Sequence, residues 1–123
     1  MNRTTGYFRF EKLDVWKDAR RFVTIIYEIT DSFPAKEQFG LTDQIRRAAV
    51  SIILNIAEGS TKGSDPDFRR FLKMSQGSVN EVVTGFYISL DRKFVTNSQF
   101  DKVYQEALRI NARLNALIKS ISR

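Results

Sequence analysis

Apolar side chains recur every three or four residues along four segments of the chain, which is the spacing of an amphipathic helix. In the first segment Trp16, Phe22, Ile26 and Phe33 fall on one helical face, and Pro34 ends the pattern. No segment shows the alternation that is typical of a strand. The pattern predicts an all-α chain with an N-terminal arm at residues 1–11 and helices at about residues 12–33, 41–59, 65–92 and 97–121.

The ends of the predicted helices carry residues that commonly start or stop a helix. Gly59 is suited to end the second helix, and Ser64 or Asp65 to cap the third. Thr96 and Gln99 have the spacing of a capping box. The short loops between these helices place consecutive helices antiparallel. We therefore predict one domain over residues 1–123, an antiparallel up-down-up-down four-helix bundle.

The second helix has unusually little polar surface. Its main polar positions fall within an arc of roughly 80° on a helical wheel, and apolar or small residues fill nearly all of the rest. A surface helix normally shows solvent about half of its circumference. We therefore expect a second copy of the chain to cover part of this helix. The polar positions are Arg47, Ser51, Asn55 and Glu58, and the candidates for the oligomer interface are Ile53 and Leu54.

The third helix carries two glycines on one line, Gly77 and Gly85, with Glu81 between them. A glycine inside a helix costs about 1 kcal/mol relative to alanine. Two such glycines favour the close approach of another helix, so both are further candidates for the oligomer interface. The alternative is that the two glycines are merely tolerated.

Glu81 needs a partner if it is buried, and Arg47 or Asn55 could supply one. We therefore predict a structural polar network formed by Arg47, Ser51, Asn55, Glu58 and Glu81. The alternative is that Glu58 and Glu81 act as a general acid and base. Because no nucleophile, metal-ligand set or phosphate-binding loop accompanies them, we expect no catalytic residue, no metal and no cofactor.

Composition narrows the possible chemistry. The 123 residues include no cysteine and no histidine, which excludes disulfides, thiolate metal sites and a Ser-His-Asp triad. No apolar run is long enough to span a membrane, and the N-terminus lacks the apolar core of a signal peptide, so we expect a cytoplasmic protein with no membrane partner. The net charge of +6 favours an anionic partner, nucleic acid first, although a basic protein without such a partner is the alternative.

Basic residues gather on the first, third and fourth predicted helices. The group on the fourth helix could follow the phosphates of a nucleic acid, or could be a solvated helix face. The arm residues Tyr7, Phe8, Arg9 and Phe10 could contact a single strand, or could cover the open end of the bundle. The possible nucleic-acid contacts are Arg20, Arg21, Arg69, Arg70, Lys73, Lys102, Arg109 and Arg113.

Several stretches together resemble one bacterial family. They are FEKLDVWKDARRF at residues 10–22, IYEITDSFP at 26–34, FGLTDQIRRAAVSIILNIAEGS at 39–60 and DFRRFLKMSQGSVNEV at 67–82. In this order they are similar to the four-helix-bundle proteins of 23S rRNA intervening sequences, which are also called a ribosomal protein family. The resemblance implies a homo-oligomer, and a pentameric ring is the assembly that it favours most. It also implies a structural relation to the accessory protein of diversity-generating retroelements, a nucleic-acid-binding bundle.

The residues and the resemblance together lead to one functional expectation. We expect a non-catalytic homo-oligomer that associates with RNA or DNA through its basic surfaces. The alternative is a scaffold for protein–protein interaction that binds no nucleic acid, for which the apolar surface of the second helix is the motivation.

Overall fold

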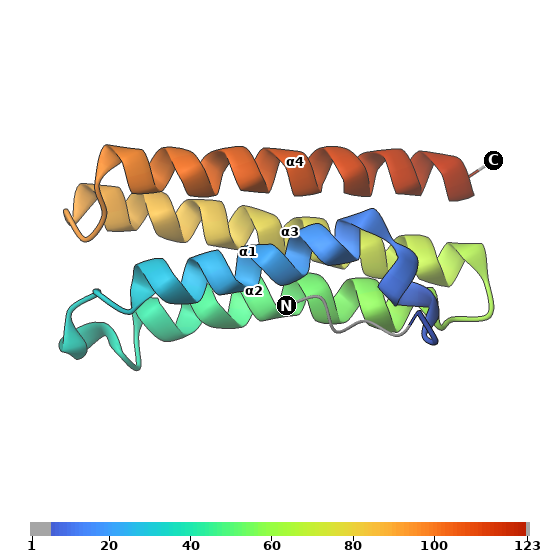
Figure 1. Ribbon diagram of the computed structural model, residues 1–123, viewed down its shortest axis with the longest axis horizontal. Coiled ribbons are helices and arrows are strands. Elements are labelled where there is room, and N and C mark those ends of the chain that lie inside the picture. The colour runs from blue at the N-terminus through green and yellow to red at the C-terminus, as the bar shows by residue number, and fades with distance from the viewer. Residues whose placement is uncertain (1–5, 123) are drawn as a thin grey trace.

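The computed structural model describes residues 6–122, which fold into four long helices (Figure 1). Each helix packs against its neighbours in the sequence, and α1 closes the ring by packing against α4. No strand occurs within the described residues, so the predicted all-α antiparallel four-helix bundle is confirmed. The elements are η1 (Arg9–Lys12), α1 (Asp14–Thr30), η2 (Ala35–Glu37), α2 (Leu41–Ser60), α3 (Asp65–Asp91) and α4 (Asn97–Ile121).

The first helix is shorter than the pattern predicted, because α1 ends at Thr30. The hydroxyl of Thr30 donates to the carbonyl oxygen of Ile26 at 2.7 Å and accepts from Arg46 Nε at 2.8 Å. Phe33 then leaves the helix but still packs into the core, with its ring 5.5 Å from that of Phe94. The apolar periodicity therefore continued past the end of the helix, because a loop residue fills the end of the core.

Two glycines allow α2 and α3 to come close together. A Cβ atom on Gly59 would lie 2.7 Å from Cβ of Phe71, and one on Gly85 would lie 2.6 Å from Cγ1 of Ile45. The helix α2 runs through Gly59 to Ser60, so the prediction that Gly59 ends it is wrong. Gly59 is needed for its small size rather than for its conformational freedom.

The starts of α3 and α4 follow the predicted capping pattern. Ser64 Oγ accepts from the backbone nitrogen of Asp67 at 3.3 Å, so Ser64 rather than Asp65 caps α3. Thr96 and Gln99 form a capping box, with each side chain accepting from the backbone nitrogen of the other. These caps satisfy backbone donors that the first turn of a helix leaves unpaired.

The core runs along the axis of the bundle and takes large side chains from all four helices. Burial of each such side chain contributes about 1.5–3 kcal/mol to folding. No helix within residues 6–122 is both long and apolar enough to cross a membrane. The side chains that lose essentially all solvent contact include Phe22, Ile26, Ile52, Phe68, Leu72, Phe86, Ile110 and Leu114.

Candidate nucleic-acid interface

The centre of the polar stripe on α2 joins this helix to α3. Asn55 Nδ2 donates to Ser51 Oγ at 3.0 Å, and Ser78 Oγ of α3 donates to the same oxygen at 3.0 Å. One turn away, the buried Ser75 donates to the carbonyl oxygen of Ile52 at 2.8 Å. Ser78 belongs to this network, and Ser75 makes a separate bond between the same two helices. The stripe therefore holds two helices of one chain together at its centre.

The other predicted members of the network are exposed. Arg47 Nε donates to Asp43 Oδ2 at 2.9 Å on the same helix, and this bond raises the pKa of the Arg47 guanidinium. Glu58 pairs with Lys62 at 3.0 Å, and Glu81 faces solvent. Within one chain the prediction of a single network is wrong for Arg47, Glu58 and Glu81. Arg47 and Glu58 pair with residues four positions away in the chain, and Glu81 lines an open hollow between α2 and α3 without a bond or ion pair to a described residue.

The two carboxylates of the acid–base alternative lie at different levels of the bundle. Gly59, next to Glu58, packs against Phe68 of α3. Glu81 comes 13 residues after Phe68, which is about 20 Å along the helix axis. One chain does not bring this pair together. Within residues 6–122 there is also no cluster of acidic side chains that could hold a metal ion.

Two of the predicted nucleic-acid contacts are held by a buried carboxylate between α1 and α4. Asp18 is only 5% exposed, and its two oxygens lie 3.1 Å from Arg21 Nη2 and 3.1 Å from Arg113 Nη1. Arg21 also reaches Glu106 of α4 at 3.2 Å, and this bond is the largest cause of a raised pKa of the Arg21 guanidinium. Arg21 and Arg113 therefore fasten α1 to α4, and their charges are largely compensated.

Three other predicted contacts surround an open hollow at the start of α3. The hollow has a volume of about 470 Å³ and is lined by Arg69, Arg70 and Lys73, together with Pro66 and Met74. The guanidinium of Arg70 lies 3.6 Å from a carboxylate oxygen of Asp67, a loose and exposed pair. Arg69 and Lys73 form no ion pair with a described residue, so this hollow carries net positive charge. We call it the basic hollow.

The remaining predicted cations are dispersed. Arg20 lies over the ring of Trp16 at 5.8 Å, and Lys102 and Arg109 are exposed on α4 without an ion pair among the residues that the structure describes. The predicted stripe of Lys102, Arg109 and Arg113 is interrupted, because Arg113 turns toward Asp18.

Residues 6–11 of the N-terminal arm pack against the end of the bundle, and the rest of the predicted arm lies outside the described residues. Arg9 Nη1 donates to the carbonyl oxygen of Ser60 at 3.1 Å, and its guanidinium lies 5.2 Å from the ring centre of Phe68. Phe10 stacks between Phe8 and Trp16. Of the two interpretations of this arm, the geometry favours the one in which it covers the end of the core.

The four candidates for an oligomer interface fall into two groups. Gly85 is buried against Ile45, and Ile53 packs against the core, so contacts within the chain account for both. The predicted close approach of another helix at Gly85 is confirmed, but that helix is α2 of the same chain, so the prediction that Gly85 faces a second copy is wrong. Leu54, in contrast, is 61% exposed, and a Cβ atom on Gly77 would meet nothing within 4 Å.

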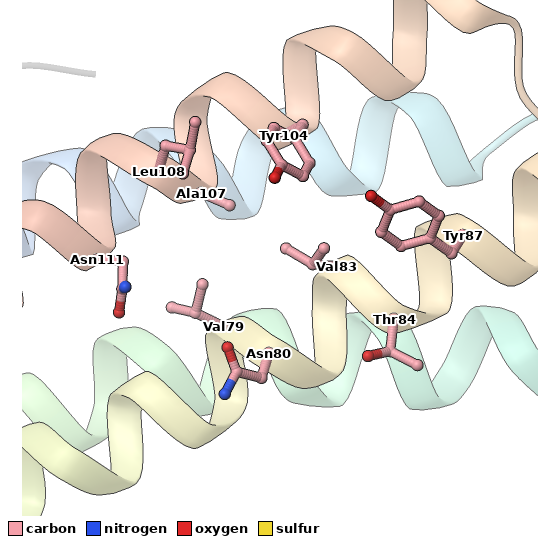
Figure 2. A pocket seen from close by; sticks show the side chains of 9 residues that line it. All are labelled: Val79, Asn80, Val83, Thr84, Tyr87, Tyr104, Ala107, Leu108 and Asn111. Carbon is pink, nitrogen blue, oxygen red and sulfur yellow. The ribbon is translucent and has the colours of Figure 1, made fainter.

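A pocket between α3 and α4 contains residues that sequence reasoning missed (Figure 2). It has a volume of about 270 Å³. Figure 2 shows the side chains of Tyr87 and Tyr104 toward one end and those of Asn80 and Asn111 toward the other. Leu108, 49% exposed, lies on its rim. We call this the α3–α4 pocket.

The sequence did contain a signal for this pocket. Asn80 and Tyr87 are seven residues apart on α3, and Tyr104 and Asn111 are seven residues apart on α4. A spacing of seven keeps both members of each pair on one face of their helix. In two antiparallel helices these pairs can bring the tyrosines to one end of a pocket and the asparagines to the other. Whether they do so depends on the register between the helices, which the sequence alone does not give.

Comparisons with known proteins agree with the fold. A solved structure from Bacteroides thetaiotaomicron, described as a protein with unknown function from the S23 ribosomal protein family, matches with a TM-score of 0.77. The match has 24% sequence identity and covers 85% of this chain and 98% of the other, and at that identity it shows the fold alone. A search of curated proteins found no match. The model of the 23S rRNA-intervening sequence protein family matches residues 11–116, and the chain belongs to that family.

Proposed function

We propose that this protein is a non-catalytic homo-oligomer that associates with RNA in the cytoplasm, and that the basic hollow is its main contact with phosphates. The observation that carries the proposal is the concentration of Arg69, Arg70 and Lys73 around one open hollow in a chain of net charge +6. Arginine and lysine that neutralise phosphates release condensed counterions, so such a surface binds nucleic acid in a salt-dependent way. The family's link to 23S rRNA supports RNA as the partner.

Homo-oligomerisation is the second part of the proposal, with a pentamer as the state that the resemblance implies. Apolar side chains that the bundle leaves uncovered support it, because a single chain gains nothing from exposing them. Leu54 is 61% exposed on α2, and Ile88 is 46% exposed on α3. Light scattering should give a mass several times 14.2 kDa, and a monomeric mass at all concentrations would contradict this part.

The RNA proposal is tested by removing the charges of the basic hollow. We expect a variant with Arg69→Gln, Arg70→Gln and Lys73→Gln to bind single-stranded RNA more weakly and to reduce the salt slope of log K by up to about three. Fluorescence anisotropy over a series of salt concentrations measures both quantities.

The matched control removes three charges from the opposite end of the bundle, as Lys36→Gln, Arg92→Gln and Lys93→Asn. Asparagine is chosen at position 93 because Lys93 has a positive φ of 62°. If both variants lose the same amount of RNA affinity, binding depends on the net charge of the protein rather than on the basic hollow. If the wild-type protein binds no RNA even at low salt, the proposal is wrong.

A scaffold for protein–protein interaction is the second candidate. Phe39, in the loop before α2, is 89% exposed beside a hollow of about 580 Å³ that Tyr27 and Leu54 also line. An exposed aromatic residue beside an open hollow is typical of a protein-binding anchor. Under this alternative, Phe39→Ser abolishes capture of one identified protein after nuclease treatment and leaves RNA affinity unchanged.

A further inference from the structure

The basic hollow and the α3–α4 pocket lie along the same face of α3. Arg69, Lys73, Gln76, Asn80 and Tyr87 follow one another at steps of four, three, four and seven residues, which keeps them on one side of the helix. We call them the α3 strip. Arg69 and Lys73 line the hollow, and Asn80 and Tyr87 line the pocket. Lys73 and Asn80 are about 10 Å apart along the axis, so one extended ligand can contact both.

Two hydrogen bonds fix the register between the α3 strip and α4. Arg69 Nη1 donates to Ser122 Oγ at 3.3 Å, and Gln76 Nε2 donates to Asn115 Oδ1 at 2.6 Å. Each step of seven residues forward on α3 is thus matched by seven residues backward on α4. The pocket follows the same antiparallel order, with both asparagines toward one end and both tyrosines toward the other, as Figure 2 shows.

The pocket offers a fixed aromatic surface. The ring of Tyr87 is 49% exposed, and it is held by Phe100, whose ring centre is 4.8 Å away at an angle of 60°. Phe100 in turn contacts Tyr104 at 5.8 Å. A half-exposed ring supported from one side has its remaining surface free to stack on a flat ligand.

The pocket also offers unused hydrogen-bonding groups. The side chains of Asn80 and Asn111 make no hydrogen bond with another residue among those described, and each amide has both donors and an acceptor. An asparagine amide can pair with the edge of a base, and with adenine it can form two bonds at once. No charged side chain lines the pocket, so its chemistry suits a neutral, flat ligand with polar edges.

We infer that the α3–α4 pocket binds two neighbouring unpaired bases of a single-stranded RNA whose phosphates lie over the basic hollow. One base stacks on Tyr87, and the amides of Asn80 and Asn111, which lie about 10 Å away along the axis, contact the edge of the next base toward the basic hollow. Recognition of unstacked bases by aromatic stacking and amide hydrogen bonds is a general mode of single-strand binding. The inference rests on the proposed function and adds to it the class of ligand group and the residues that contact it.

The test compares two probes, a short fluorescent oligoadenylate and an abasic ribose-phosphate strand of the same length. Tyr87→Ala should weaken binding of the oligoadenylate by about fivefold to a hundredfold and leave binding of the abasic strand unchanged. Tyr27→Ala is the matched control, because Tyr27 is 40% exposed on α1 and lies outside the pocket. This control should bind both probes as the wild type does.

A second variant keeps the inference testable if Tyr87→Ala fails to fold, as judged by circular dichroism. Asn111→Leu keeps the branched shape of the side chain but replaces its amide by methyl groups, and it should weaken oligoadenylate binding several-fold with no effect on the abasic strand. Equal losses for both probes, or no loss for either, would overturn the inference while leaving the proposed function in place. A wild-type protein that binds neither probe would overturn the proposed function and the inference with it.

Light scattering of the Tyr87→Ala variant supplies a further check. An unchanged mass agrees with a pocket that is open to RNA in the oligomer. A reduced mass would show that a second copy of the chain covers the pocket, and it would overturn the inference.

Discussion

Single glycines show how differently one residue type can act within one helix pair. Gly59 and Gly85 sit where α2 and α3 touch, and a methyl group on either would overlap a neighbouring side chain. Gly77 lies on the same helix as Gly85, yet the space around it is open. Close packing within the chain therefore offsets the low helix propensity of glycine at Gly85, whereas no such packing occurs at Gly77.

Substitution of Gly85 and Gly77 by alanine should have opposite effects. Gly85→Ala places a Cβ atom 2.6 Å from Ile45, so we expect a loss of about 1–3 kcal/mol in the free energy of unfolding. Gly77→Ala should raise stability by up to about 1 kcal/mol, because alanine favours the helix. Chemical denaturation of the two variants measures both changes. A loss of stability or of oligomeric mass in Gly77→Ala would show that another chain packs there.

Removal of the charge of Asp18 tests the contact between α1 and α4. Asp18→Asn should lower the free energy of unfolding by about 1–2 kcal/mol, because Arg21 and Arg113 lose their shared partner. The loss is small because both arginines are partly exposed and partly screened by solvent. Asp14→Asn, at an exposed position on the same helix, is the control and should change stability by much less. Equal losses in the two variants would contradict this account.

At the residue scale the sequence predicted which residues share a face of a helix, but not which residues of other helices they contact. A helical wheel correctly grouped Ser51 with Asn55, but it could not show that Ser78 lies opposite them on α3. It likewise counted Arg113 as a free cation, because Asp18 lies on another helix and meets Arg113 only in the folded bundle. A pairing between helices depends on their relative height and rotation, which a single sequence does not specify.

At the element scale the helices and most of their ends follow from local chemistry. The caps at Ser64 and Thr96 were predictable because the residues involved are three positions apart in the chain. The end of α1 was not, because Phe33 continues the apolar pattern after the helix has stopped. The α3–α4 pocket was missed for a related reason: its residues come from two helices whose register is set by Gln76 and Asn115.

The capping box of α4 gives a prediction at this scale. Thr96→Ala removes the oxygen that accepts from the backbone nitrogen of Gln99, so we expect a loss of about 1 kcal/mol in stability. Thr96→Asn, which restores a good capping group, should recover most of this loss. Thermal unfolding followed by circular dichroism distinguishes the two variants, and equal melting temperatures for alanine and asparagine would argue against a capping role.

At the scale of the whole molecule the proposed assembly predicts a thermal behaviour. If apolar side chains such as Leu54 and Ile88 are buried between copies, association stabilises the folded chain by mass action. The melting temperature should then rise with protein concentration. The variant Leu54→Glu should weaken this dependence, whereas a melting temperature that is the same at all concentrations would contradict the assembly.

The α3–α4 pocket has different chemistry at its two ends. Both tyrosines lie toward one end and both asparagines toward the other, so a strand along the pocket meets aromatic rings first in one direction and amides first in the other. Arg69 and Lys73 come earlier on α3 and lie beyond the asparagine end only. The rings, the amides and the charges therefore together set one polarity for a bound strand.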